Sequence, residues 1–202
     1  LFLNSAYFTY MISTGMGQLF IFFIAVFMSD CIFRDYNYQT SHFFFTKPIK
    51  KSSYLLGRFF SNVFTAGIIF ACFYLGLFTG SLFHGLDPSY FGDFKLINYI
   101  IPFFVSTIPN ILIFSSILFA LAVITKKSFP VYIATIIMLI GYSIASNTAQ
   151  NLGHKMLFSL ADPFSLITFF FDTEYWSIAE QNSRILPDSG YLFYNRLLWG
   201  FI

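Results

Sequence analysis

Four long stretches of this chain contain no Asp, Glu, Lys or Arg, and they restrict the fold more than any other feature. A membrane-spanning helix needs roughly 20 apolar residues, because the hydrocarbon core is about 30 Å thick and each helical residue rises about 1.5 Å. Each stretch is long enough to span. Only 10% of all residues are charged, against about 25% in soluble domains, so the sequence predicts an integral membrane protein. The uncharged stretches cover residues 1–29, 59–83, 96–125 and 129–153.

The apolar runs favour helices over a β-barrel. Barrel strands alternate apolar and polar residues at every second position, whereas the run from Leu19 to Phe27 is almost continuously apolar. Since only helices and closed barrels satisfy the backbone in lipid, the sequence predicts an all-α fold, a polytopic membrane helical bundle. We expect four full spans and a fifth that is truncated by the end of the chain. The expected spans are residues 8–28, 60–83, 103–125, 129–149 and 191–202.

Both ends of the chain suggest an excerpt of a longer polypeptide. The first residue is Leu1, and the last six residues from Leu197 begin an apolar run that has no end. We therefore expect residues 1–202 to be a fragment of a six-span membrane domain. Pro102 and Pro109 lie near the start of the third span, where we expect them to kink the helix or mark its beginning.

Basic residues predict the orientation of the spans, because Lys and Arg favour the cytoplasmic side. Residues 30–58 and 126–128 are therefore expected in the cytoplasm. Residues 84–95 and 150–190, which are rich in Asp and Glu, are expected outside. The seven basic residues on the cytoplasmic side are Arg34, Lys47, Lys50, Lys51, Arg58, Lys126 and Lys127.

The sequence carries no motif for catalysis. It has no phosphate-binding loop of the Gly-x-x-x-x-Gly-Lys-Ser/Thr kind, no His-Glu-x-x-His pair and no Gly-x-Ser-x-Gly elbow. We therefore expect no catalytic residue, no metal site and no cofactor in this chain. The four full spans also contain no acidic or basic side chain, which argues against an ion-coupled transporter. The absence of such side chains is compatible with a transporter that receives its energy from the cytoplasm. It also favours an apolar or amphipathic cargo.

The predicted cytoplasmic loop, residues 30–58, is the most informative segment. Phe33, Tyr36, Thr40 and Phe43 or Phe44 recur at helical spacing, so an amphipathic helix is expected up to Phe45, before Pro48. The simplest interpretation is a basic interfacial helix that rests on anionic lipid.

The same loop resembles the signature of type-2 ABC export permeases. The resemblance rests on Arg34-Asp35, the amphipathic stretch, Thr46-Lys47-Pro48-Ile49, Lys50-Lys51 and the run from Tyr54 to Arg58. It implies a coupling element that docks on a separate ATP-binding subunit, which holds ATP and Mg. It further implies a second membrane domain, so that the transporter is a homodimer or a heterodimer of such domains. It also implies a location in a bacterial inner membrane, with contacts to membrane lipid and none to nucleic acid. The implied coupling residues are Arg34, Asp35, Tyr36, Phe43, Phe44, Pro48, Lys50 and Lys51.

A closer resemblance concerns the C-terminal part. The segments 175–182, 190–192 and 195–199 look like bacterial permeases that are fused to a C-terminal zinc aminopeptidase-like domain. The chain itself has none of the zinc ligands of such a domain. The alternative function is a non-transport membrane protein, for example the anchor of a fused peptidase, whose cytoplasmic helix binds lipid.

Two further groups of residues are expected to have structural roles. Gly76 and Gly80 form a small-xxx-small pair that would allow another helix to approach closely. In the outer segment 150–190 we expect short helices that lie in or dip into the outer leaflet, with a bend at Asp162-Pro163 and with Tyr175 and Trp176 at the headgroup level. The alternative is a plain soluble loop. The resemblance implies that this segment helps to close an outer gate.

Overall fold

Helices are the only regular secondary structure in the part of the chain that the computed structural model describes, which is residues 1–38, 50–82, 87–151, 155–187 and 190–201. Within these described residues, four helical runs are long and apolar enough to cross a membrane. The all-α membrane helical bundle expected from the sequence is therefore confirmed. The four runs are α1 (Ala6–Asn37), α3 (Lys51–Ser81), the continuous run Ile97–Thr125 and α6 (Ser128–Asn151).

Helix α1 is longer than the apolar span that the sequence predicted. Ser5 caps its first turn, because the Ser5 hydroxyl accepts a hydrogen bond from the Phe8 N–H at 3.3 Å. The helix then continues nine residues past position 28 and ends at Asn37. No Gly or Pro interrupts residues 29–37, so the backbone ladder has no reason to stop at the edge of the apolar stretch. Residues 30–37, where an amphipathic helix was expected, are thus helical and continue α1 without a break.

The third span consists of three consecutive helical segments. It starts at Ile97, earlier than the predicted position 103, with α4 (Ile97–Pro102), the π-helix η2 (Phe103–Thr107) and α5 (Ile108–Thr125). Pro102 ends α4 and Pro109 lies in the first turn of α5. Proline has no N–H to donate, so each proline removes one ladder hydrogen bond beside a junction. The prolines therefore mark both ends of the π-helix, in agreement with the expected irregularity.

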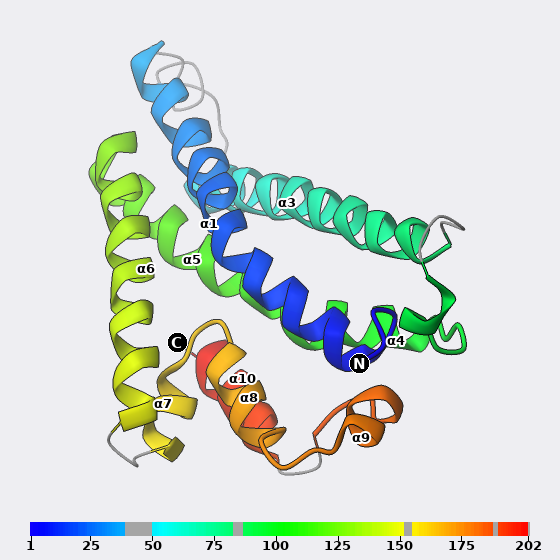
Figure 1. Ribbon diagram of the computed structural model, residues 1–202. Helices are drawn as coiled ribbons and strands as arrows, with labels where there is room; N and C mark the ends of the chain where they lie inside the picture. Colours follow the sequence, from blue (N-terminus) through cyan, green and yellow to red (C-terminus); the bar gives the residue numbers. More distant parts are fainter. Residues whose placement is uncertain (39–49, 83–86, 152–154, 188–189, 202) are drawn as a thin grey trace.

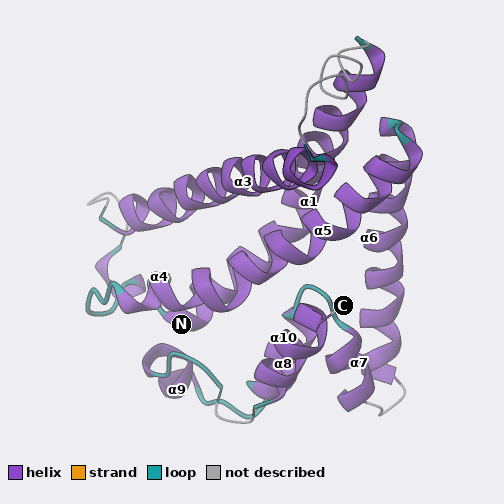
Figure 2. Cartoon of the chain, turned by 180° about the vertical axis from the view of Figure 1, so that it is seen from behind, coloured by secondary structure: helices purple, strands orange, loops and turns teal. Residues whose placement is uncertain are grey.

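The long helices alternate in direction. Helices α1 and α5 run side by side in the same direction, while α3 and α6 return in the opposite one (Figure 1). Viewed from behind, α3 and α6 lie on opposite flanks of the α1–α5 pair (Figure 2). All four helices contribute side chains to one apolar core, which includes Ile21, Met28, Phe70, Phe114, Leu118 and Val131.

The segment 150–190 forms short helices, as expected. They are α7 (Lys155–Ala161), α8 (Leu166–Asp172) and α9 (Ile178–Ser183), and α10 (Tyr191–Phe201) follows them. They gather at the end of the bundle that also holds the N-terminus (Figure 1). Phe164 and Phe169 are fully buried, and the Phe169 ring stacks on Tyr10 of α1 with centroids 4.1 Å apart. The segment is therefore a packed part of the bundle.

Candidate functional site

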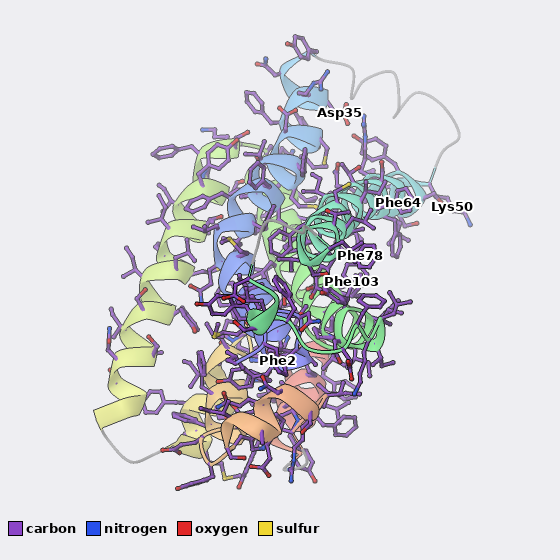
Figure 3. All side chains as sticks on the ribbon, turned by 45° about the vertical axis from the view of Figure 1, so that its right-hand side comes forward. Phe2, Asp35, Lys50, Phe64, Phe78 and Phe103 are labelled. Atoms are coloured by element: carbon purple, nitrogen blue, oxygen red, sulfur yellow. The ribbon has the colours of Figure 1, made fainter. Side chains whose placement is uncertain are left out.

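A buried carboxylate joins α1 to α3 at one end of the bundle. Asp35 is only 6% exposed, although it lies in the last turn of α1. Its Oδ1 accepts a hydrogen bond from Arg58 Nη2 at 2.7 Å, and its Oδ2 accepts one from the Tyr54 hydroxyl. Both carboxylate oxygens thus bond to α3, near its beginning. Figure 3 shows Asp35 at this end of α1 and Lys50 at the start of α3. We call Asp35, Tyr54 and Arg58 the inner clamp.

A cavity of about 510 Å³ opens beside the inner clamp. Four charged side chains line it, together with Cys31, Asn62 and apolar neighbours. Arg34 and Asp30 form an exposed ion pair one helical turn apart, at 3.6 Å, which contributes little in water. Because both signs of charge line this space, it suits polar groups better than apolar ones. The charged lining residues are Asp30, Arg34, Asp35 and Arg58.

The other predicted coupling residues lie at the same end where the structure describes them. Lys126, in the α5–α6 turn, places its Nζ 4.8 Å from the centroid of the Tyr36 ring, a favourable cation–π distance. Lys50 is the exposed N-cap residue of α3 and Lys51 is its first residue. The predicted coupling residues Phe43, Phe44 and Pro48 lie outside the described residues.

The predicted helix-packing pair faces open space. A Cβ atom at Gly76 or at Gly80 would meet no atom within 4 Å in the described part of the chain. Both glycines are exposed on α3. Within the described residues the pair therefore packs against no other helix.

Asp162 closes the bend between α7 and α8. It is 2% exposed, and its oxygens accept hydrogen bonds from the N–H groups of Phe164 at 2.8 Å and Ile167 at 2.7 Å. The bend predicted at Asp162-Pro163 is therefore confirmed. Ser165 next to it has a left-handed backbone with φ of 63°. Burial raises the pKa of the Asp162 carboxyl to about 6, while its hydrogen bonds and the nearby Arg196 charge oppose that rise.

Three further polar side chains surround this bend. The Asn195 amide group donates to the carbonyl oxygens of Ser159 at 2.7 Å and Asp162 at 2.8 Å. Arg196 donates to Asn195 Oδ1 at 2.6 Å and, through Nη1, to Asn110 Oδ1 at 2.7 Å. We call Asn110, Asp162, Asn195 and Arg196 the outer network. It connects α5, the α7–α8 bend and α10 through hydrogen bonds inside the bundle.

The four residues predicted for an outer gate occupy two places. Asp162 belongs to the outer network, and the Pro163 carbonyl accepts a hydrogen bond from Arg196 Nη2 at 3.2 Å. Tyr175 and Trp176 instead follow α8. Tyr175 is 89% exposed, and Trp176 lies half-buried with its ring centroid 6.3 Å from that of Tyr7 on α1.

The prediction from sequence did not select the outer network as a polar cluster. Asn110 sits in a mostly apolar helix, and Asn195 and Arg196 lie at the start of the expected fifth span. An ionisable residue inside an apolar run was the available signal, since such residues usually mark functional positions in membrane helices. Their mutual contact depends on the fold, because residues 110, 162 and 195 are far apart in the chain.

The helical bundle with a buried polar cluster near each end defines a multi-pass α-helical membrane protein. Comparison with protein-family models, with curated proteins and with solved structures finds no match. Within the residues that the structure describes, no group of three or more His, Cys, Asp or Glu side chains is placed to hold a metal ion. The inner clamp and the outer network are therefore the two candidate functional sites.

Proposed function

We propose that this chain is the membrane-spanning permease subunit of an ABC transporter of the type-2 export kind. In this proposal a separate ATP-binding subunit hydrolyses ATP with Mg, and a second membrane domain completes the transport path in a bacterial inner membrane. The loop resemblance suggests the family, and the inner clamp is the single structural observation that supports a coupling role for that loop.

The inner clamp would allow the loop to transmit a displacement to both α1 and α3. Asp35 lies close to the end of α1, and Tyr54 and Arg58 lie in the first turns of α3. Hydrogen bonds to a largely buried carboxylate are stronger than bonds between neutral groups. A partner that moves the segment between the two helices would therefore move both helix ends together. Helix α1 then carries the displacement into the core, where Met28 packs against the other spans.

A non-transport membrane protein with a lipid-binding loop is the second candidate. Lys50 and Lys51 are exposed at the clamped end of the bundle, and exposed lysines at that position suit an anionic lipid surface. The two functions differ in what Phe43 and Phe44 contact. In a coupling element they fill a groove on the ATP-binding subunit, whereas in a lipid-binding loop they insert between lipids.

The test is a double Phe43→Ala and Phe44→Ala variant, co-purified with its ATP-binding subunit from membranes. Truncation of an aromatic hot spot costs about 2 kcal/mol or more of binding free energy, so we expect normal insertion but loss of the complex. The matched control is Phe60→Ala with Phe64→Ala, two exposed phenylalanines on α3. This control should keep the complex. A complex that survives the 43/44 double change supports the lipid-binding function instead.

A further inference from the structure

A cavity of about 470 Å³ lies between α5 and α10, next to the outer network. Its volume falls in the range of small-molecule sites. Among the described lining residues Arg196 is the charged one, and most of the others are apolar. A cation at the edge of an apolar cavity is unusual, because an unpaired charge is costly to remove from water. The apolar wall includes Leu112, Ile113, Ile117 and Trp199.

The hydrogen bonds of Arg196 leave its charge without direct neutralisation. A guanidinium has five N–H donors, and the structure gives partners to four of them. Nε and Nη2 donate to Asn195 Oδ1 at 3.0 and 2.6 Å, Nη2 also donates to the Pro163 carbonyl at 3.2 Å, and Nη1 donates to Asn110 Oδ1 at 2.7 Å. All these acceptors are uncharged. The second Nη1 N–H has no partner among the described residues.

The nearest negative charge acts on Arg196 only from a distance. Asp162 influences the guanidinium electrostatically, but the Asp162 oxygens accept their hydrogen bonds from the N–H groups of Phe164 and Ile167. The outer network thus holds the guanidinium in a fixed position and leaves one donor available. A ligand that binds there gains a charge-assisted hydrogen bond without having to order the side chain first.

We propose that this cavity binds an anionic amphiphile, with its carboxylate or phosphate on Arg196. The aliphatic part of the ligand lies along Leu112, Ile113 and Ile117 of α5. The head gains the charge-assisted hydrogen bond, and the tail loses contact with water as it enters the apolar part of the cavity. This ligand chemistry occurs both in free fatty acids and in acidic membrane lipids.

Trp199 makes the site directly observable. The chain has two tryptophans, and Trp199 lines the cavity while Trp176 does not. A Trp176→Phe variant in phosphatidylcholine nanodiscs therefore reports on this cavity through bromine quenching. The probes are dibromostearate and its methyl ester, which differ in the charge of the head. At a pH where the acid is ionised, we expect it to quench saturably at a concentration about tenfold lower than the ester, as one charge-assisted hydrogen bond predicts.

Two variants in the Trp176→Phe background test the assignment. Arg196→Gln should abolish the preference for the acid over the ester. Because that change also alters the outer network, Ser116→Phe tests the cavity independently. Ser116 lines the cavity, and among the described residues its hydroxyl bonds only to the Leu112 carbonyl, at 2.8 Å. Ser143→Phe is the matched control on α6, because this exposed serine makes the same bond to Leu139 at 2.9 Å. Of these two serine substitutions, Ser116→Phe should weaken quenching by the acid and Ser143→Phe should not.

The outcomes separate the ligand sources and the alternatives. A preference for brominated phosphatidylglycerol over brominated phosphatidylcholine identifies an acidic lipid as a ligand, and a preference seen with stearate alone identifies a free acid. Equal quenching by acid and ester, an unchanged preference in folded Arg196→Gln protein, or unchanged quenching by the acid in folded Ser116→Phe protein overturns the proposal. No ATP-binding subunit is needed, so the result is independent of the proposed transport function.

Discussion

Asp162 shows how one residue can both shape the backbone and carry a perturbed charge. Its two oxygens bond to backbone N–H groups on the far side of Pro163, which fixes the direction in which α8 leaves the bend. The same contacts require the carboxyl to be buried, and burial disfavours its charged form. The pKa of Asp162 consequently rises to about 6, from an ordinary value near 3.8.

This raised pKa predicts a pH dependence of stability. Well below pH 3.8 the carboxyl is protonated in both the folded and the unfolded chain, so it imposes no penalty. Between about pH 4 and 6 the unfolded chain releases its proton first, and the free energy of unfolding falls as the pH rises. A shift of about two units corresponds to a loss of roughly 3 kcal/mol at most. Thermal unfolding in a non-ionic detergent, followed by tryptophan fluorescence from pH 4 to 7, measures this effect.

The Asp162→Asn variant isolates the contribution of this carboxyl. Its amide cannot titrate. The free energy of unfolding of the original chain, minus that of the variant, should therefore decrease steadily from pH 4 to 6. Asp93→Asn, which changes an exposed carboxyl before α4, should leave the pH profile of the original chain in place. A difference that stays constant or grows over this interval would mean that the buried carboxyl is not the titrating group.

At the scale of elements, α1 and α3 are connected where their apolar parts end. The last turns of α1 carry Asp30, Arg34 and Asp35, and the first turns of α3 carry Tyr54 and Arg58. Only Asp35 of the three α1 residues is buried. The contact between the two helices at this end is therefore directional, because it depends on one carboxylate and its two donors.

Replacement of Asp35 by Asn should loosen this contact. Tyr54 and Arg58 would lose a charged acceptor, and we expect a loss of about 1–3 kcal/mol in stability, toward the lower end because the Arg58 side chain is 37% exposed and its interaction is screened by solvent. Hydrogen exchange of residues 30–37 in nanodiscs should accelerate. The control is Asp30→Asn, which removes only the exposed pair with Arg34 and should change stability by less than about 0.5 kcal/mol. Equal effects of the two substitutions would show that the clamp contributes no stability.

At the scale of the whole molecule, the four long helices alternate in direction and gather basic residues at one end. The inner clamp places Arg58 beside the end of α1, and the Lys126–Tyr36 contact places the α5–α6 turn there as well. The short helices α7 to α9 lie at the opposite end (Figure 1). This arrangement agrees with the charge distribution along the sequence.

Single cysteines should therefore be labelled from opposite sides of the membrane. In a chain with Cys31 and Cys72 changed to Ser, Lys51→Cys and Lys127→Cys should react with a membrane-impermeant maleimide only when the cytoplasmic face is accessible. Tyr175→Cys, at a position that is 89% exposed, should react only from the outside. Labelling of positions 51 and 175 from the same side would contradict the number of spans.

Local sequence already determined the class of fold and the approximate positions of the spans. Uncharged stretches of sufficient length can satisfy their backbone in lipid only as helices, and this holds whatever the neighbouring helices are. The bend at Asp162-Pro163 was also predictable, because a proline after a short polar residue favours a turn. The helix ends were less accurate. Helix α1 continues to Asn37 and the third span begins at Ile97, because helix hydrogen bonding does not depend on where hydrophobicity ends.

Only the tertiary structure decided which polar residues meet. Asp35 and Arg34 are neighbours in the sequence, and nothing in the sequence indicates which of the two is buried. In the structure Asp35 is buried against Tyr54 and Arg58, while Arg34 stays exposed. Likewise, Asn110 and Arg196 come together over a separation of 86 residues. A side chain's partners depend on the rotation of its helix and on how the helices cross, and both are set by packing of the whole core. Length, hydropathy and charge therefore determined that this chain forms membrane helices, and packing between those helices determined where its buried charges lie.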